Sequence, residues 1–257
     1  MMMVEIPKNA FKQALREGRQ QIGFWSTIPD PYLTEILSGA GFDWLLLDSE
    51  HSPTDIRLMM LQLQAGRAGP TTLIVRPQVN DPVLIKQYLD IGAQTLLLPM
   101  IQSADEATAA VSAMRYPPAG IRGVATMTRA SRFGRAENYL QRAEEELCLL
   151  VQVESKEAVE QIEAIADVDG VDGIFIGPSD LAASLGHRGE PFHPEVVQTI
   201  EAAIGRITAA GKPAGILTPN VEFAQRCMDL GTRFTAVGSD MGLLLNGAEA
   251  LAQKFSD

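Results

Sequence analysis

Short apolar runs recur along the chain, and segments whose apolar residues repeat at helical spacing lie between them. An apolar run of about four to eight residues is typical of a strand buried on both faces, and its alternation with amphipathic segments predicts parallel strands joined by helices. The runs that we predict to be strands are residues 21–25, 44–48, 72–76, 95–99, 149–153, 173–177, 213–217 and 233–237. Eight strands with covering helices predict an α/β fold, the (β/α)8 or TIM barrel.

Three pairs of residues that end in proline mark where helices begin between these runs. They are Asp30-Pro31, Asp81-Pro82 and His193-Pro194, in which the first residue can cap the helix and the proline fits its first turn. Gly92 and Gly211 follow the last apolar repeat of two of these segments and predict where those helices end.

The longest connection, residues 100–148, interrupts this rhythm with two irregular stretches, residues 116–123 and 127–134. Long irregular loops in compact domains are usually functional, so we expect this loop to cover the mouth of the barrel. No linker, repeat or low-complexity tract divides the 257 residues. We therefore expect one domain over residues 1–257, a length that suits one α/β barrel.

Composition excludes several classes of partner. The formal net charge of -11 argues against binding to nucleic acid, which needs a basic surface. No apolar run approaches the roughly 20 residues that span a bilayer, and the first residues lack the pattern of a signal peptide. We expect a soluble, cytoplasmic protein in which Cys148 and Cys227 are buried thiols.

Ionisable residues gather where the predicted strands end. Asp48, Ser49, Glu50 and His51 directly follow the apolar run of the second strand, in the stretch LLLDSEHSP. Residues after three other strands complete the set: Arg76 ends the third, Glu154 follows the fifth and Asp180 follows the sixth. The carboxyl ends of barrel strands carry the active site, so these groups are expected to converge at one rim.

Glu154 and Asp180 follow neighbouring strands, and Gln152 points the same way as Glu154. Oxygen ligands of this kind suit hard divalent cations such as Mg²⁺ or Mn²⁺. Zinc is less natural, because His187 and His193 lack the spacing of a tetrahedral site with cysteines and are interpreted as loop or capping residues.

Nucleophilic mechanisms find no support in the chain. It contains no Gly-x-Ser-x-Gly elbow, no Cys-His arrangement and no glycine-rich phosphate motif. A Schiff-base mechanism needs a desolvated lysine inside the barrel, and no lysine falls at such a position in the predicted strands.

Five segments together resemble the HpcH/HpaI aldolases, the metal-dependent class II pyruvate aldolases. Within this family the chain is most similar to the 4-hydroxy-2-oxoheptanedioate aldolases, and 2-keto-3-deoxy sugar-acid aldolases are also similar. The segments are GFDWLLLDSEHSP, VRPQVNDPVLIKQYLDIGAQTLLLPMIQ, YPPAGIRGV, LLVQVES and VDGIFIGPSDL. The resemblance extends over nearly the whole chain. It implies a lyase that reversibly cleaves 4-hydroxy-2-oxo acids to pyruvate and an aldehyde.

The resemblance also implies roles for single residues. Glu154 and Asp180 would hold a divalent ion (Mg²⁺, Mn²⁺ or Co²⁺) that chelates pyruvate, Arg76 would face the keto oxygen, and His51, oriented by Asp48, would be the acid/base. Asp90 would reach the site of a neighbouring subunit, near the aldehyde. The substrate-binding residues predicted on this basis are Trp25, Arg76, Asp90, Gln152, Ser179 and Asp180.

The sequence specifies neither the oligomeric state nor the aldehyde. The stripe of Leu244, Ala248, Leu251 and Phe255 is typical of a helix packed on its own barrel, whereas members of the family exchange this helix between subunits and form hexamers. Residues 23–29 and 218–220 would line an aldehyde pocket of undetermined size.

Two other functions fit the same barrel. A citrate-lyase-type acyl-thioester lyase shares the metal-enolate chemistry but needs a basic surface for the coenzyme phosphates, and the only candidates are Arg129, Arg132 and Arg135 in the long loop. A non-catalytic barrel that binds an acidic metabolite is the other alternative, against which the full set of ionisable groups speaks.

Overall fold

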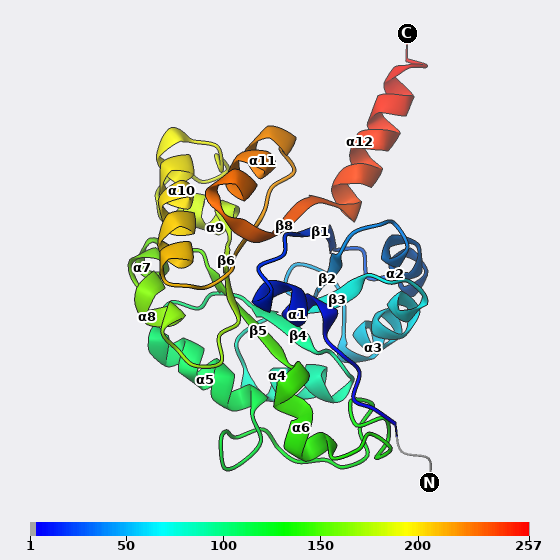
Figure 1. Cartoon of the computed structure of the whole chain (residues 1–257). Coiled ribbons are helices and arrows are strands. Elements are labelled where there is room, and N and C mark those ends of the chain that lie inside the picture. Colours follow the sequence, from blue (N-terminus) through cyan, green and yellow to red (C-terminus); the bar gives the residue numbers. More distant parts are fainter. Residues whose placement is uncertain (1–3, 257) are drawn as a thin grey trace.

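Eight parallel strands, hydrogen-bonded in chain order, close into a barrel in the computed structural model, which describes residues 4–256 (Figure 1). The strands are β1 (Gln21–Ser26), β2 (Trp44–Asp48), β3 (Thr72–Arg76), β4 (Thr95–Leu98), β5 (Cys148–Val153), β6 (Gly173–Ile176), β7 (Ala214–Leu217) and β8 (Thr232–Ser239). Each lies within two residues of its predicted bounds, so the TIM barrel is confirmed. The predicted domain also includes residues 1–3 and 257, which lie outside the described residues.

Helices surround the barrel, and α1 lies across its centre in the view of Figure 1. They are α1 (Ala10–Arg16), α2 (Pro31–Ser38), α3 (Ile56–Ala65), the 3₁₀ turn η1 (Gly66–Ala68), α4 (Pro82–Asp90), α5 (Ala104–Met114), α6 (Tyr139–Glu146), α7 (Lys156–Glu160), α8 (Ile162–Ala166), α9 (Pro178–Ser184), α10 (Pro194–Ala209), α11 (Val221–Leu230) and α12 (Asp240–Gln253). No helix in this part of the chain is long and apolar enough to cross a membrane.

The predicted capping residues begin their helices. The Asp30 side chain accepts from the backbone N–H of Leu33 at the start of α2, and Asp81 does the same for α4. His193 caps α10 by accepting from the backbone N–H of Glu195. Each cap satisfies N–H groups that have no partner inside the helix.

An aromatic column fills the inside of the barrel. Helix α1 closes the barrel at the amino ends of the strands and contributes the first ring of the column. Phe11 of α1 lies with its ring centroid 6.0 Å from that of Trp44 and 5.8 Å from that of Phe234. Phe175 continues the column to Trp25, at a centroid distance of 5.6 Å. A second, larger apolar layer packs the outer faces of the strands against the helices. Both Cys148 and Cys227 are buried free thiols, as predicted.

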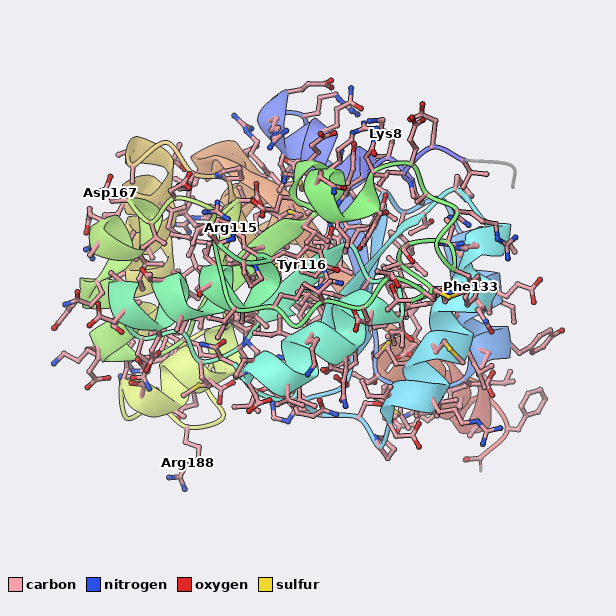
Figure 2. The ribbon with its side chains drawn as sticks, turned by 90° about the horizontal axis from the view of Figure 1, so that it is seen from below. Lys8, Arg115, Tyr116, Phe133, Asp167 and Arg188 are labelled. Atoms are coloured by element: carbon pink, nitrogen blue, oxygen red, sulfur yellow. The ribbon has the colours of Figure 1, made fainter. Side chains whose placement is uncertain are left out.

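The long loop between α5 and α6 does not cover the mouth of the barrel, so that prediction was wrong. Arg129 donates to the carbonyls of Ile91 and Leu63, at the ends of α4 and α3 that are remote from the mouth. A β-bridge joins Ala136 to Val4 near the start of the described chain. The loop therefore lies along the flank of the barrel, as the positions of Tyr116 and Phe133 in Figure 2 show.

Helix α12 begins at the mouth and projects away from its own barrel (Figure 1). Its apolar side chains are exposed: Leu244 by 60%, Leu251 by 59% and Phe255, just beyond the helix, by 83%. The prediction that this stripe packs on the barrel of the same chain was wrong, because only Asp240 of α12 is buried. An exposed apolar face of this kind is typical of a surface that interacts with another molecule.

Candidate active site

Asp48 and Arg76 lie side by side at the ends of two neighbouring strands. The parallel register pairs Asp48 of β2 with Arg76 of β3. Arg76 donates from Nε to Asp48 Oδ1 at 2.9 Å and from Nη2 to Oδ2 at 2.5 Å, and both side chains are almost fully buried. Trp25 of β1 donates from its indole N–H to Asp48 Oδ2 at 3.2 Å, and its ring lies 4.9 Å from the guanidinium carbon. This two-pronged geometry fixes the planar guanidinium in one orientation.

The charge of Asp48 is stabilised despite its burial. Desolvation alone would raise the pKa of this carboxyl, but the hydrogen bonds and positive charge of Arg76 outweigh it and hold the pKa below its usual value. Backbone N–H groups of Glu50 and His51 also donate to Oδ1. Asp48 is therefore an anion whose main partner is Arg76.

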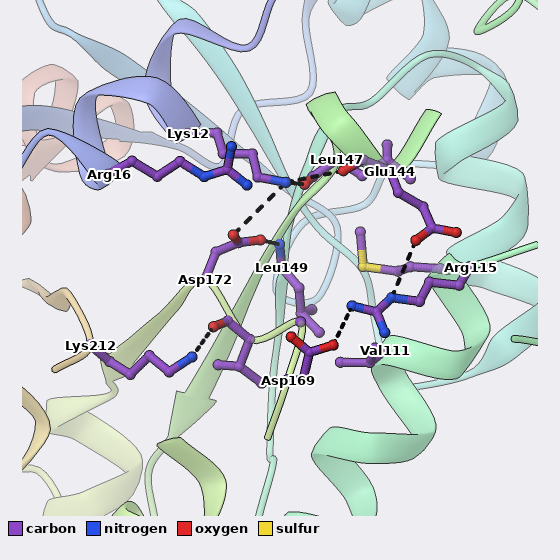
Figure 3. Close-up of a pocket in the computed structure, with 13 residues that line it drawn as sticks. Lys12, Arg16, Val111, Arg115, Glu144, Leu147, Leu149, Asp169, Asp172 and Lys212 are labelled. Atoms are coloured by element: carbon purple, nitrogen blue, oxygen red, sulfur yellow. Dashed lines mark hydrogen bonds and ion pairs between the residues drawn. The ribbon is translucent and has the colours of Figure 1, made fainter. Parts of the chain in front are cut away.

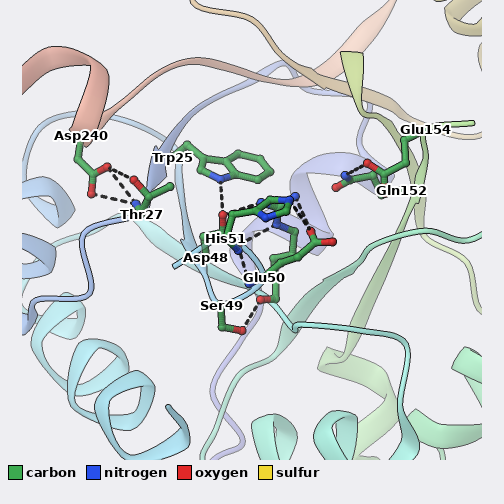
Figure 4. A network of polar contacts seen from close by, with 10 residues as sticks. Trp25, Thr27, Asp48, Ser49, Glu50, His51, Gln152, Glu154 and Asp240 are labelled. Atoms are coloured by element: carbon green, nitrogen blue, oxygen red, sulfur yellow. Dashed lines mark hydrogen bonds and ion pairs between the residues drawn. The ribbon is translucent and has the colours of Figure 1, made fainter. Parts of the chain in front are cut away.

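Glu50 and His51 follow on the turn after β2 (Figure 4). Glu50 Oε2 lies 2.8 Å from Arg76 Nη1, so the guanidinium bridges two carboxylates. Burial raises the pKa of Glu50, Arg76 and His51 lower it, and the charges of Asp48 and Asp180 raise it further. The His51 side chain is 66% exposed, and the carboxylate nearest its ring is Glu50, with Nε2 3.9 Å from Oε2. The prediction that Asp48 orients the ring was wrong, since Asp48 reaches only the backbone N–H of His51.

A hydroxyl chain supports this turn, and sequence reasoning missed its far end. Ser49 donates from Oγ to the carbonyl of Arg76 at 2.6 Å, and the Tyr88 hydroxyl lies 2.8 Å from Ser49 Oγ and 2.9 Å from Gln78 Oε1. Tyr88 repeats at helical spacing in α4, which indicated only an apolar packing role. Nothing local in the sequence places its hydroxyl next to β2.

Glu154 stands on the opposite side of the mouth, directly after β5. Its Oε1 accepts from the backbone N–H of Met100 at 2.8 Å, and its Oε2 accepts from Gln152 Nε2 at 2.5 Å. Burial raises the pKa of Glu154 to about 7, since the two hydrogen bonds offset only part of the desolvation and the charges of Asp180 and Glu50 add to it. Each oxygen of the Glu154 carboxylate retains a free lone pair.

Asp180 and Ser179 lie in the first turn of α9, after β6, and both are exposed. No hydrogen bond or ion pair to another described residue occupies the Asp180 carboxylate. Gln152 Oε1 is buried and has no hydrogen-bond partner. A buried acceptor without a donor is costly, and together with two adjacent carboxylates it forms an oxygen-only set that fits a hard divalent cation.

Gly177 allows β6 to approach Glu154 closely. A Cβ atom built on Gly177 would lie 2.5 Å from Glu154 Oε2 and 2.8 Å from its Cβ. A Cβ atom does not make non-bonded contacts this short, so any side chain here would displace the Glu154 carboxylate. The motif Gly177-Pro178-Ser179-Asp180 thus makes room for the carboxylate of Glu154 and supplies a second carboxylate beside it.

The two other histidines form a different cluster. The rings of His187 and His193 stack 3.5 Å apart at an angle of 15°, and His187 Nε2 lies 2.7 Å from Glu195 Oε2. Three ligand-type side chains therefore lie close together. Nearly parallel rings cannot both direct an in-plane lone pair at one ion, however, and His193 Nδ1 already accepts from the backbone N–H of Glu195. The cluster closes a loop and caps α10, as the sequence predicted.

Asp90 does not join the site of its own chain. It ends α4 at the far end of the barrel and pairs with Arg122, at 2.7 Å between Oδ1 and Nη2. The Arg122 guanidinium is fully buried, and its central carbon lies 4.5 Å from the centre of the Tyr116 ring. Trp25, Asp48, Arg76, Gln152, Glu154, Ser179 and Asp180 meet at the mouth, and Asp90 is the one predicted site residue that lies elsewhere.

Two sizeable cavities lie at the amino ends of the strands, remote from this site. One of about 310 Å³ is shown in Figure 3, and one of about 420 Å³ adjoins it. In the first, Arg115 lies between Glu144 and Asp169, and Lys12 and Lys212 donate to backbone carbonyls. These cations already have protein partners, and none is near the carboxylates of the mouth.

Comparison with known proteins places this geometry in context. A family model described as HpcH/HpaI aldolase/citrate lyase matches residues 21–247. The chain is 58% identical to a pyruvate aldolase of Rhizobium etli, over 98% of this chain and all of that protein. It is 56% identical to a 4-hydroxy-2-oxo-heptane-1,7-dioate aldolase of Salmonella heidelberg, over 96% of this chain and 95% of that protein.

Solved structures agree with the sequence relatives. An HpcH/HpaI aldolase/citrate lyase family protein from Burkholderia cenocepacia superposes with a TM-score of 0.93 at 38% identity, covering 96% of this chain and 99% of that one. A citrate synthase, SbnG, superposes with a TM-score of 0.85 at 25% identity, covering 95% and 96% of the two chains. The same barrel thus occurs in proteins named for different reactions. With a family model that spans most of its length and relatives above 50% identity, this chain belongs to the HpcH/HpaI aldolase/citrate lyase family.

Proposed function

We propose that the protein is a metal-dependent lyase that reversibly cleaves 4-hydroxy-2-oxo acids to pyruvate and an aldehyde. The observation that carries this proposal is the pairing of an oxygen-only ligand set, Glu154 with Asp180, with a fixed guanidinium, Arg76, at one mouth. Relatives named as aldolases for 4-hydroxy-2-oxo-heptane-1,7-dioate and pyruvate support the same substrate class.

Glu154 and Asp180 would hold a divalent cation, Mg²⁺, Mn²⁺ or Co²⁺, with Gln152 beside them. When bound, such a cation supplies positive charge that stabilises the enolate formed as the C3–C4 bond breaks. Glu154 has its pKa raised by burial and by neighbouring acids, so its anionic form gains most from a cation. Ser179 and Gln152 border the same space and would contact the carboxylate half of pyruvate.

Arg76 would direct its remaining N–H groups at the keto oxygen. Its Nε and one N–H of Nη2 donate to Asp48, and Nη1 forms an ion pair with Glu50. The N–H groups of Nη1 and the second N–H of Nη2 make no hydrogen bond to a described residue. A guanidinium keeps its proton throughout the reaction and so stabilises developing negative charge without proton exchange. The Trp25 ring packs against the guanidinium and would limit how far it can move towards the inside of the barrel.

His51 would accept the proton of the C4 hydroxyl during cleavage and return it during synthesis. An imidazole can carry out both steps near neutral pH. The ring is exposed at the mouth, with Nε2 3.9 Å from Oε2 of Glu50.

The acyl-thioester alternative is weaker, because the basic residues it needs are elsewhere. Arg129 lies on the flank, donates to two backbone carbonyls and has its pKa lowered to about 10, mainly by burial. A guanidinium used in this way is not available to coenzyme phosphates at the mouth.

Exchange of the pyruvate methyl protons with solvent, in the absence of an aldehyde, tests the role of Arg76. We expect Arg76→Ala to slow exchange of the pyruvate methyl protons with solvent by about 10² to 10³, the usual effect of removing one oxyanion donor, and Arg76→Lys to remain impaired because lysine lacks the fork geometry. Exchange in D₂O with Mn²⁺ present can be followed by mass spectrometry, alongside cleavage of 4-hydroxy-2-oxoheptanedioate.

Arg57→Ala is the matched control for this experiment, since Arg57 is an exposed arginine in the first turn of α3. Circular dichroism would check that Asp48 and Glu50, left without their cation, do not unfold the variants. Wild-type exchange in Arg76→Ala would remove Arg76 from enolate chemistry, and absence of both exchange and cleavage in the wild type would overturn the proposed function.

We also propose that α12 docks on a partner subunit and that the assembly is a hexamer in which Asp90 of the partner subunit borders the aldehyde. The exposed leucines of α12 support the docking, and the family resemblance supports the hexamer. Light scattering should give the mass of six chains for the wild type and a smaller mass for Leu244→Glu with Leu251→Glu. Leu230→Glu adds the same charge to the end of α11 and should leave the mass unchanged; a monomeric wild type would contradict the proposal.

A further inference from the structure

A buried carboxylate at the junction of β8 and α12 binds the chain segment that follows β1. Asp240 Oδ2 accepts from Ser26 Oγ at 2.8 Å and from the backbone N–H of Ile28 at 3.0 Å. Its Oδ1 accepts from Thr27 Oγ1 at 3.0 Å, and the backbone N–H of Thr27 lies 3.0 Å from both oxygens. Three consecutive residues are therefore held by one side chain, and Figure 4 shows its contacts with Thr27.

No cation neutralises Asp240 among the described residues, although it is only 5% exposed. A buried charge without a counter-ion is costly unless several donors solvate it. Here residues 26–28 and the backbone N–H of Met241, at 2.7 Å, provide those donors. An apolar contact or a neutral side chain could close the barrel at this point, so the use of a charge calls for a role beyond packing.

The segment held by Asp240 lies across the mouth from the proposed metal ligands. In a closed barrel with strands in the order β1 to β8, the β8–β1 side faces β4 and β5. Glu154 follows β5, whereas Thr27 follows β1, and Figure 4 places Thr27 and Glu154 on opposite sides of His51. A substrate whose pyruvate half lies at Glu154 and whose C4 hydroxyl lies at His51 therefore extends its remaining carbons towards residues 26–28.

The end of β1 also supplies Trp25, a residue that contacts the charged groups of the site. Trp25 and Ser26 are consecutive in β1, so their side chains point to opposite faces. Trp25 points inward to Asp48 and Arg76, while Ser26 points outward to Asp240. The Asp240 carboxylate thus fixes residues 26–28 directly after Trp25, the last residue of this segment that contacts Asp48 and Arg76.

Resting on the proposed function, we propose that Asp240 is a positioning residue that holds residues 26–28 as the wall against which the aldehyde half of the substrate packs. It touches neither the pyruvate half nor the proposed cation site. Its loss is therefore expected to affect recognition of the aldehyde half more than formation of the enolate.

Asp240→Asn keeps the shape but turns one acceptor oxygen into an NH₂ group that faces N–H and O–H donors. We expect the KM for 4-hydroxy-2-oxoheptanedioate, and for the aldehyde in synthesis, to rise by about 10- to 100-fold, the scale of an error of an ångström in positioning. Exchange of pyruvate methyl protons, measured with Mn²⁺ in D₂O, should stay close to the wild-type rate. Thr27→Val removes a single donor and should give a smaller rise in KM. Thr27→Ser keeps the hydroxyl and should leave KM close to the wild-type value.

Glu249→Gln is the matched control, because it removes one exposed carboxylate from the same helix. An unchanged KM in both Asp240→Asn and Thr27→Val would overturn the proposal, and so would a parallel fall of exchange and cleavage. If Asp240→Asn does not fold, the Thr27→Val and Thr27→Ser pair decides alone. A wild type that neither exchanges pyruvate protons nor cleaves the substrate would instead overturn the proposed function, so the two failures are distinct.

Discussion

Removal of divalent cations by a chelator is expected to abolish carbon–carbon cleavage, and Mg²⁺, Mn²⁺ or Co²⁺ is expected to restore it. Asp180 lies close enough to Glu154 for its charge to raise the pKa of Glu154, and no arginine or lysine pairs with either carboxylate among the described residues. Without a cation, their repulsion opposes the anionic form that the ligands need. Glu154→Ala and Asp180→Ala should therefore lose both metal binding, measured by calorimetry, and turnover.

A steric variant tests the same site without removing a ligand. Gly177→Ala should weaken metal binding, because the new methyl group would overlap Glu154 Oε2. Glu157→Ala is the matched control, since it removes an exposed carboxylate three residues after Glu154. Full activity of metal-stripped protein would contradict the assignment. Covalent trapping of pyruvate by borohydride would do so as well, because it would reveal an imine on a lysine.

Replacement of His51 by alanine is expected to slow cleavage by about 10² to 10⁴, the usual contribution of a positioned acid/base. Pyruvate binding should change little. The His51 ring is not one of the proposed metal ligands, and it is separate from the N–H groups of Arg76 that are proposed to bind the keto oxygen. Steady-state cleavage and pyruvate inhibition, each measured across pH, would separate the two effects.

His187→Ala is the control for this variant, because His187 lies in the loop before α10 and pairs with Glu195 in the first turn of that helix. It should leave cleavage unchanged. Near-wild-type turnover of His51→Ala at every pH would show that another group moves the proton.

The barrel could be predicted because its signals are local. Each strand is buried on both faces and so reads as a short apolar run, and α2, α4 and α10 begin with a capping side chain followed by proline. The long loop could not be placed, because the contacts that hold it on the flank, such as those of Arg129 with Leu63 and Ile91, join residues far apart in sequence. The apolar stripe of α12 was visible, but a stripe does not specify which surface covers it.

The candidate site was predictable as a set of residues and less so as a set of contacts. Strand ends brought Asp48, Arg76 and Glu154 to one rim because all parallel strands end on the same side. The pairing of Asp48 with Arg76 instead of His51 depends on the register of β2 and β3, which no short motif reveals. Asp240 was missed for a related reason: its partners are more than 200 positions away in the chain.

The aromatic column inside the barrel has a consequence for the strength of every charge above it. Trp25 and Phe175 lie directly beneath the mouth, and Phe234, Trp44 and Phe11 continue below them, so the floor of the site has few groups that can reorient around a charge. Two unit charges 4 Å apart interact by about 1 kcal/mol in water and by about 4 kcal/mol at the effective dielectric constant of roughly 20 that is typical near protein. Rings that cannot solvate ions would thus let the guanidinium of Arg76, in its proposed role, interact with an enolate several times more strongly than it would in solvent.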